Sequence, residues 1–217
     1  MNTSSDKVCK TVRQYNKTPI PAEDMEKLLE IAEDYRRVKN YVYSRYGGRG
    51  GLAKIYPGYT VQNEMTKSGL RAAMEMPAVY FYLAVYDALG DIKTQWTRTK
   101  AKVLKLTGEN EGFTAEEKHY LRFLLKSSNA FEAVLNRKEI RLPQEMQKRH
   151  EELAAQVDSA KLHRYLCRQV RKYHVGKQHT DAATGFCVTE RAYRYADHGL
   201  YLSTKQNRKR IFVPLTD

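Results

Sequence analysis

A stretch of basic, aromatic and glycine residues at positions 35–63 has the side chains needed to bind a polyanion. It contains six Lys/Arg, six tyrosines and no Asp or Glu, with Gly47-Gly48-Arg49-Gly50-Gly51 at its centre. Cationic side chains bind phosphate, tyrosine rings stack on bases or sugars, and glycine lets a backbone approach a ligand closely. The combination favours a nucleic-acid contact surface, and the alternative is a helix end with a solvated basic face. The candidate contact residues here are Arg36, Arg37, Lys39, Arg45, Tyr46, Arg49, Tyr56 and Tyr59.

Three further segments without a carboxylate, residues 92–108, 159–180 and 198–216, carry five, six and four Lys/Arg. The rest of the chain, outside these four basic segments, has 17 Lys/Arg against 25 Asp/Glu, although the net charge of the whole chain is +13. A surface whose charges serve only to keep the protein soluble has positive and negative groups mixed together. The separation of basic from acidic residues in this sequence therefore indicates a polyanionic partner. The further candidate contact residues are Trp96, Arg98, Lys100, Lys102, Lys161, Arg164, Arg168, Arg171, Lys172, Arg208, Lys209 and Arg210.

Four of these cations, from Lys161 to Arg171, recur at steps of three and four residues and therefore share one face of a helix. Four like charges on one face repel each other unless a polyanion lies against them. We expect nucleic acid to bind this face, and a solvated face is the alternative.

The side chains that could catalyse a reaction or hold a metal form no recognisable set. The three cysteines include no CxxC pair, and no phosphate-binding loop, nucleophile elbow or HExxH motif occurs. Asp87 and Asp91 are one helical turn apart, but two carboxylates alone do not define a metal site, so we interpret them as solvated or salt-bridging residues. We expect no catalytic residue, metal ligand or cofactor in this chain, and infer a binding protein.

The sequence also suggests a compartment. An odd number of cysteines fits a reducing environment, and no apolar run approaches the roughly 18–20 residues that span a membrane. The first residues lack the apolar core of a signal peptide. We expect a soluble cytoplasmic protein with no membrane partner.

The elements that must position these residues are mostly helical. Apolar periodicity and proline or glycine punctuation predict helices at residues 21–47, at 60–71 with an interruption near Gly69, and at 78–106. Further helices are predicted from a capping box at Thr114 and Glu117 through Leu135, and at 143–174. Alternating residues predict strands at 7–18, 191–196, 200–204 and 210–215. The first strand needs a sheet, and the only strands available to form it are at the other end of the chain. We therefore predict a mostly helical α+β fold, with a helical part inserted into a small β unit built from both termini.

Four phrases resemble the N-terminal half of the TnpB/OrfB family of transposon-encoded RNA-guided endonucleases, relatives of the type V CRISPR effectors. They are DYRRVKNYVYSRYGG (34–48), IYPGYTVQNEMTKSGLR (55–71), PAVYFYLAVYDALGDIKTQWTRTKAKV (77–103) and RKRIFVPLTD (208–217). The resemblance implies a wedge domain, an oligonucleotide-binding-type β-barrel, at residues 1–20 and 176–217. It implies a helical recognition domain at 21–175.

The same resemblance implies a guide RNA and a target DNA as partners, in a prokaryotic cytoplasm and on the nucleoid when bound. The RNA–DNA heteroduplex of such proteins lies in a basic channel. Tyr46, Tyr56 and Tyr59 would lie near the duplex that flanks the target. Gln62, Asn63 and Lys67 would lie there too, because Gln and Asn amides pair with adenine edges.

This sequence departs from the family in one large respect. The family cleaves DNA with a RuvC domain whose carboxylates hold Mg²⁺, and neither those carboxylates nor a CxxC zinc ribbon occurs in these 217 residues. We expect the chain to be catalytically inactive by itself, with cleavage supplied by a separate RuvC-containing polypeptide if the chain is a split or truncated protein. Two alternatives stay open: a stand-alone DNA- or RNA-binding regulator, and a helical interaction or assembly protein.

Overall fold

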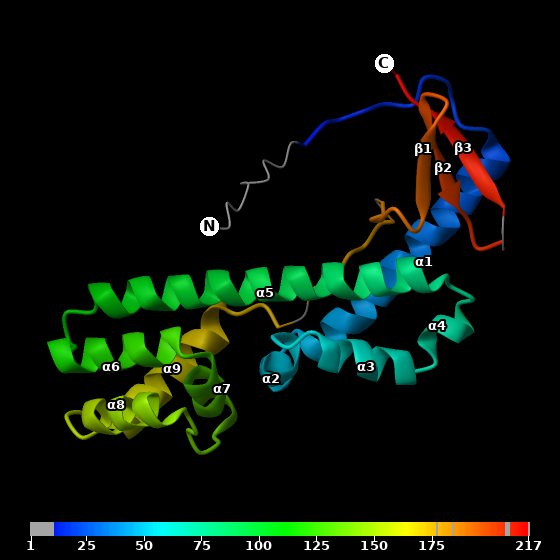
Figure 1. Ribbon diagram of the computed structural model, residues 1–217. Helices are drawn as coiled ribbons and strands as arrows, with labels where there is room; N and C mark the ends of the chain where they lie inside the picture. Colours follow the sequence, from blue (N-terminus) through cyan, green and yellow to red (C-terminus); the bar gives the residue numbers. More distant parts are fainter. Residues whose placement is uncertain (1–10, 177, 184, 207–208, 217) are drawn as a thin grey trace, which may run out of the picture.

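The computed structural model describes residues 11–176, 178–183, 185–206 and 209–216. Within these ranges the chain forms nine α-helices, one 3-10 helix and a three-stranded antiparallel sheet. Figure 1 shows the sheet at one end of an elongated molecule, and helices α6 to α9 at the other end. The prediction of a mostly helical α+β fold is confirmed.

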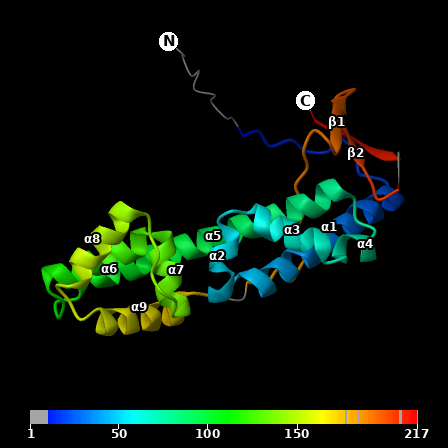
Figure 2. The same ribbon diagram turned by 60° about the horizontal axis from the view of Figure 1, so that its bottom comes forward.

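Two long helices form the frame. Helix α1 (Ala22–Tyr46) begins after Pro21, and helix α5 (Ala78–Glu109) begins after Pro77. Proline suits the start of a helix because the first backbone N–H groups have no partner inside the helix. The two helices pack against each other, and α5 continues along the helical part of the molecule (Figures 1 and 2). Their buried side chains supply much of one continuous core.

Short elements connect the two long helices. The 3-10 helix η1 (Arg49–Gly51) is followed by α2 (Leu52–Ile55), α3 (Tyr59–Lys67) and α4 (Leu70–Ala73). Gly69 has a left-handed backbone with φ of 72° between α3 and α4, which glycine adopts without steric cost. The predicted interruption of a helix near Gly69 is therefore confirmed.

The helix predicted to run from Thr114 through Leu135 is two helices, α6 (Ala115–Lys126) and α7 (Ser128–Asn136). The expected capping box at the start of α6 is present. Ser127 ends α6 in an extended conformation, and its side chain accepts a hydrogen bond from the first turn of α7. The prediction of one helix was wrong because the apolar pattern continues across a serine that caps the second helix.

The predicted helix 143–174 is also divided, into α8 (Gln144–Ala154) and α9 (Ser159–Tyr173). Asp158 is not helical, and its carboxylate accepts a hydrogen bond of 2.9 Å from the backbone N–H of Lys161. This cap starts α9 as a separate helix. All four cations of the predicted basic face lie on α9.

The sheet consists of β1 (Tyr193–Ala196), β2 (Gly199–Ser203) and β3 (Arg210–Pro214), as predicted to within two residues at each end. Asp197 and His198 both have φ of 54° and form the two-residue turn between β1 and β2, a conformation that matches the twist of a hairpin. Ile211, Val213 and Leu215 pack with Leu28 of α1 in a second, smaller apolar cluster.

The N-terminal segment meets the sheet, as expected, but not as the predicted strand 7–18. Residues 7–10 lie outside the described residues, and from residue 11 onward only Asn16 forms a bridge, antiparallel to Leu215. The N–H of Lys17 donates to the carbonyl of Pro214, and the N–H of Thr216 donates to the carbonyl of Tyr15, each at 2.8 Å. Within the described ranges the sheet is open.

After α9 the chain returns along α1 to the sheet (Figure 1). The carbonyl of Thr180 accepts hydrogen bonds from Arg36 and Asn40 of α1, each at 3.0 Å. The ring of Phe186 lies 5.3 Å from that of Tyr80, centroid to centroid. No helix in the described part of the chain has both the length and the apolar character needed to cross a lipid bilayer.

Candidate nucleic-acid interface

Three of the four basic segments meet at one half-buried histidine, His174. Nε2 of His174, directly after α9, donates to the carbonyl oxygen of Gly47 at 2.9 Å. Nδ1 lies 3.2 Å from the hydroxyl of Thr99, and the ring stacks on Trp96 with centroids 3.6 Å apart. Residues 35–63, 92–108 and 159–180 are therefore joined in space although they are far apart in the sequence.

Helix α9 presents a cationic face to solvent. The opposite side of the helix is buried through Leu162, Leu166 and Val170, and this burial turns the arginines toward solvent. Within the described residues, the four exposed cations that follow the first turn of α9 have no carboxylate partner, whereas Lys161 is 2.7 Å from Glu117. These free cations, here called the α9 stripe, are Arg164, Arg168, Arg171 and Lys172.

Helix α5 continues this positive surface. Two ammonium groups lie near the ring of Tyr173, with Lys102 of α5 at 5.6 Å and Lys172 of α9 at 5.4 Å from its centroid. Arg98 is exposed one turn before Lys102 on the same helix. Cations from two helices therefore form one surface around a tyrosine ring, and a phosphate backbone binds to such a surface.

Several predicted contact residues have internal roles instead. Trp96 is fully buried against His174, so it cannot stack on a base. Tyr46 is 1% exposed, and its hydroxyl donates to Glu64 at 2.8 Å. Lys100 is half-buried with its ammonium 4.6 Å from the centroid of Phe131, and burial lowers its pKa. We exclude these three residues from the candidate interface because their polar or aromatic groups already contact other residues of the chain.

Lys39 is also a structural residue. Its ammonium lies 2.8 Å from Asp87 and 3.0 Å from Asp91 of α5, and only 17% of its side chain is exposed. Burial alone would lower the pKa of Lys39, but its hydrogen bonds to the two carboxylates outweigh this and raise the pKa above its ordinary value. Tyr35 and Tyr43 also donate to these carboxylates, so the interpretation of Asp87 and Asp91 as salt-bridging residues is confirmed.

The remaining cations of residues 35–63 divide between pairs and solvent. Arg36 binds Glu33 at 2.5 Å and the carbonyl of Thr180, whereas Arg37 is exposed but lies 3.3 Å from Asp34. Arg45 and Arg49 are exposed and have no carboxylate partner within the described residues. These two unpaired cations can reach an external phosphate.

Helix α3 exposes a stripe of polar residues at four-residue steps. Tyr59 is 65% exposed, and Asn63 and Lys67 follow it on the same face. Gln62 is partly engaged, since its amide oxygen accepts a hydrogen bond from Tyr86 of α5. An aromatic ring, an amide and a cation in one row can contact a groove of a duplex.

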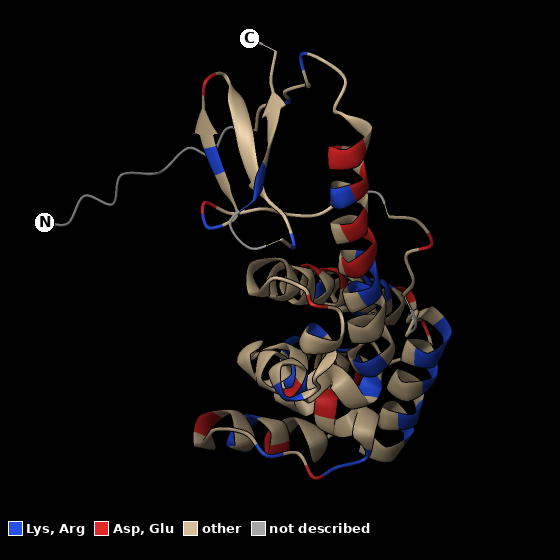
Figure 3. Cartoon of the chain, turned by 90° about the vertical axis from the view of Figure 1, so that its right-hand side faces the viewer, with Lys and Arg blue, Asp and Glu red and all other residues tan. Residues whose placement is uncertain are grey.

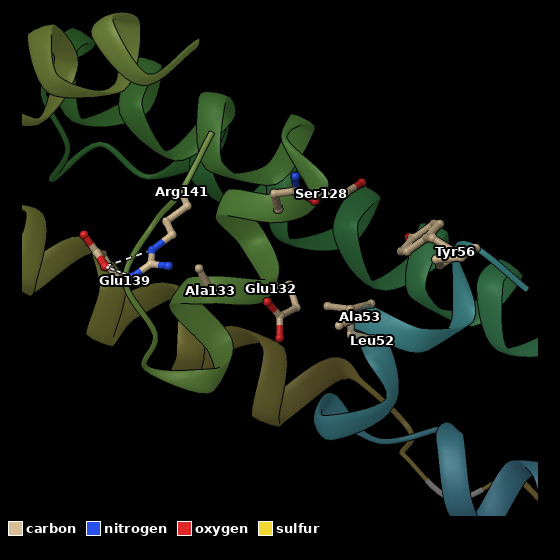
Figure 4. Close-up of a pocket in the computed structure, with 10 residues that line it drawn as sticks. Leu52, Ala53, Tyr56, Ser128, Glu132, Ala133, Glu139 and Arg141 are labelled. Carbon is tan, nitrogen blue, oxygen red and sulfur yellow. Dashed lines mark hydrogen bonds and ion pairs between the residues drawn. The ribbon is translucent and has the colours of Figure 1, made fainter. Parts of the chain in front are cut away.

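Tyr56 lines a pocket of about 360 Å³ between α2 and α7 (Figure 4). Leu52 and Ala53 face Ser128 and Ala133 across it, and Tyr56 itself is 41% exposed. Two carboxylates, Glu132 and Glu139, also line this pocket, so it is less suited to phosphate than the α9 stripe.

The fourth basic segment lies at the sheet, away from the α9 stripe (Figure 1). Lys205 pairs with Glu30 at 2.8 Å and with Asp34, both on α1. Lys209 and Arg210 are exposed at the start of β3, and Arg208 lies outside the described residues. Figure 3 shows carboxylates on the half of α1 that is beside the sheet.

Exposed cations in segments that also contain Asp or Glu could not be found by selecting segments without a carboxylate. Arg137 follows α7 directly and is exposed, but Glu132 and Glu139 flank it in the sequence. Arg122 and Lys126 are exposed one turn apart on α6, after an acidic first turn. Helical spacing would have found the α6 pair, whereas the position of Arg137 depends on the end of α7.

The described residues contain no group of three or more His, Cys, Asp or Glu side chains placed to hold a metal ion. No protein-family model, curated protein or solved structure matches this chain.

Proposed function

We propose that this chain binds nucleic acid through the α9 stripe and the adjoining cations Arg98 and Lys102 of α5. The observation that carries this proposal is the absence of carboxylate partners for the α9 stripe within the described residues, on a surface where three basic segments converge. Like charges held on one rigid face favour a bound polyanion because it offsets their repulsion.

The finer proposal is that the chain is the nucleic-acid-binding half of an RNA-guided DNA endonuclease similar to the TnpB/OrfB proteins. The helices of residues 21–175 would act as the recognition domain, and residues 1–20 and 176–217 would form the wedge barrel. Guide RNA and the RNA–DNA heteroduplex would lie along the α9 stripe and α5. The α3 stripe would contact the duplex that flanks the target. A separate RuvC-containing polypeptide would bring the carboxylates and Mg²⁺ needed for cleavage.

The decisive test compares two double charge reversals with the same change in net charge. Arg164→Glu with Arg168→Glu removes two cations of the α9 stripe, and Lys148→Glu with Arg149→Glu is the matched control on the exposed face of α8. We expect the first variant to weaken RNA and duplex binding at least about tenfold, and to reduce the slope of log affinity against log salt by about two. The control should change both quantities little.

Wild-type protein that binds neither RNA nor duplex DNA with a steep salt dependence would reject the proposal. Sequencing the RNA that copurifies with the chain tests the finer one, because a guide has a defined sequence. A stand-alone regulator is the second candidate, favoured by the exposed α3 stripe. It predicts sequence-specific duplex binding with no RNA present, and this binding would be lost on Asn63→Ala.

A further inference from the structure

Three arginines from three different elements line one open pocket of about 440 Å³. Arg49 comes from η1, Arg137 follows the last turn of α7, and Arg171 lies near the end of α9. All three are exposed, and within the described residues none of them is paired with a carboxylate. Gly50, Leu135 and Asn136 complete the pocket wall.

The backbone around this pocket is held in place by Asn136. Its side-chain amide donates to the carbonyl of Arg49 at 3.2 Å and to the carboxylate of Glu132 at 2.8 Å. The first bond fixes η1 against the end of α7. Glu132, the carboxylate one turn away, also pairs with Lys138 at 2.8 Å and is therefore already engaged.

Arg137 occupies a position that the backbone would assign to glycine. Its φ is 55°, the left-handed conformation that commonly ends a helix, and the N–H of Lys138 closes the turn by donating to Ala133 at 2.9 Å. Residues with a Cβ adopt this conformation at a steric cost. The helix dipole stabilises a cation at the C-terminal end of a helix. The dipole of α7 does not explain why two further arginines line the same pocket.

We propose that this pocket, here called the triple-arginine pocket, binds one phosphate group of a nucleic-acid strand. Guanidinium groups bind phosphate oxygens with paired, charge-assisted hydrogen bonds, and three of them offset both the charge of the phosphate and their own repulsion. The inference rests on the proposed function for its ligand, because Arg171 belongs to the α9 stripe. The phosphate is either the terminal phosphate of a strand or an internal phosphodiester.

Arg137→Gly tests the pocket without endangering the fold, since glycine suits the left-handed backbone. Arg171→Ala removes a second guanidinium, and Lys148→Ala is the control, an exposed cation of α8 that lies outside the proposed interface and does not line the pocket. The first measurement uses inorganic phosphate alone. We expect it to raise the melting temperature of wild type and Lys148→Ala, relative to chloride at equal ionic strength, more than that of Arg137→Gly or Arg171→Ala.

The second measurement uses one short RNA strand with either a 5′-phosphate or a 5′-hydroxyl. A terminal site predicts that wild type binds the phosphorylated strand about tenfold more tightly, and that Arg137→Gly abolishes the difference. An internal site predicts equal binding of both strands and a loss of about tenfold for both in Arg137→Gly. Lys148→Ala should bind as wild type does in either case.

Equal behaviour of Arg137→Gly, Arg171→Ala and Lys148→Ala in both measurements would overturn the pocket and leave the broader nucleic-acid proposal standing. A phosphate effect that depends on Arg137, together with no RNA or DNA binding by wild type, would keep the phosphate site and reject the nucleic-acid function. The two proposals can therefore fail separately.

Discussion

A buried tyrosine hydroxyl links two histidines in the helices α6, α8 and α9. The hydroxyl oxygen of Tyr120 lies 3.1 Å from Nε2 of His150 and 2.9 Å from Nε2 of His163. A hydroxyl has one proton to donate, so one ring accepts it and the other ring donates its own Nε2 proton to the hydroxyl oxygen. The ring that accepts is unprotonated at Nε2, and protonating both rings would leave the hydroxyl proton without an acceptor between them.

This arrangement predicts that stability falls in mild acid. Burial lowers the pKa of His150 and His163, and the charge of His150 lowers the pKa of His163 further. An unfolded histidine has a pKa of about 6.5, so below that pH the unfolded chain binds more protons than the folded one. The free energy of unfolding in urea should therefore decrease as the pH falls from about 6.5 toward the lowered pKa values.

The pH dependence should become flatter in His163→Gln. It should not vanish, because burial also lowers the pKa of His174 at the junction with Gly47. The matched control is His119→Gln on the exposed face of α6. The assignment of the pH dependence to the histidines with lowered pKa values would be contradicted by an equal flattening in both variants. It would also be contradicted by a free energy of unfolding that does not change between about pH 7.5 and 5.5.

Individual cations show where reasoning from the sequence stops. Lys39 and Arg45 lie on the same helix and in the same carboxylate-free segment, yet Lys39 is paired with two aspartates and Arg45 is exposed. The partners of Lys39 come from α5, 48 and 52 residues away along the chain by their numbers. A charge window along the sequence cannot detect a partner brought by another helix, so it identifies basic surfaces better than individual contacts.

The glycine loop between α1 and α2 approaches the chain's own backbone closely. A Cβ at Gly47 would lie 2.7 Å from the carbonyl oxygen of Gly176 and equally close to that of Tyr43. At Gly48 a Cβ would meet nothing within 4 Å. From the sequence, these glycines were expected to let the backbone approach a ligand closely, and at Gly47 the approaching group is the segment that follows α9.

Gly47→Ala should therefore destabilise the protein, and Gly48→Ala should not. Overpacking against a rigid backbone costs about 1–3 kcal/mol, because neither carbonyl can move far. The free energy of unfolding measured in urea compares the two variants, which add the same methyl group at adjacent positions. Equal stabilities would show that the contact with Gly176 adapts at little cost.

The elements that the sequence predicts best have strong signals at their ends. Proline, glycine and the Thr114 capping box mark the ends of α1, α3, α5 and α6, and the hairpin turn at Asp197 and His198 places β1 and β2. The missed breaks at Ser127 and Asp158 each depend on one short side chain that caps a helix inside a continuing apolar pattern. The triple-arginine pocket could not be predicted, because its three arginines meet only after three helix ends are placed.

In the described part of the chain, the α9 stripe and the exposed cations at the start of β3 are separate basic regions, with the length of α1 between them. The sheet packs near the start of α1, at Leu28, and the glycine loop follows its end at Tyr46. A helix of 25 residues is about 37 Å long at 1.5 Å per residue. This length corresponds to about 11 base pairs of duplex at 3.4 Å each, so a short nucleic acid cannot contact both regions at once.

Length dependence of binding therefore tests whether the sheet contributes to the interface. With a duplex of about 8 base pairs, Lys209→Glu with Arg210→Glu should leave the affinity nearly unchanged, while Arg164→Glu with Arg168→Glu weakens it. With a duplex of about 24 base pairs, either double variant should lower the affinity and reduce the salt slope by about two. Fluorescence anisotropy with labelled duplexes measures both quantities, and equal melting temperatures check that each variant is folded.

If the variant at β3 binds every duplex as wild type does, the sheet lies outside the binding surface, and the proposed wedge role of residues 198–216 fails.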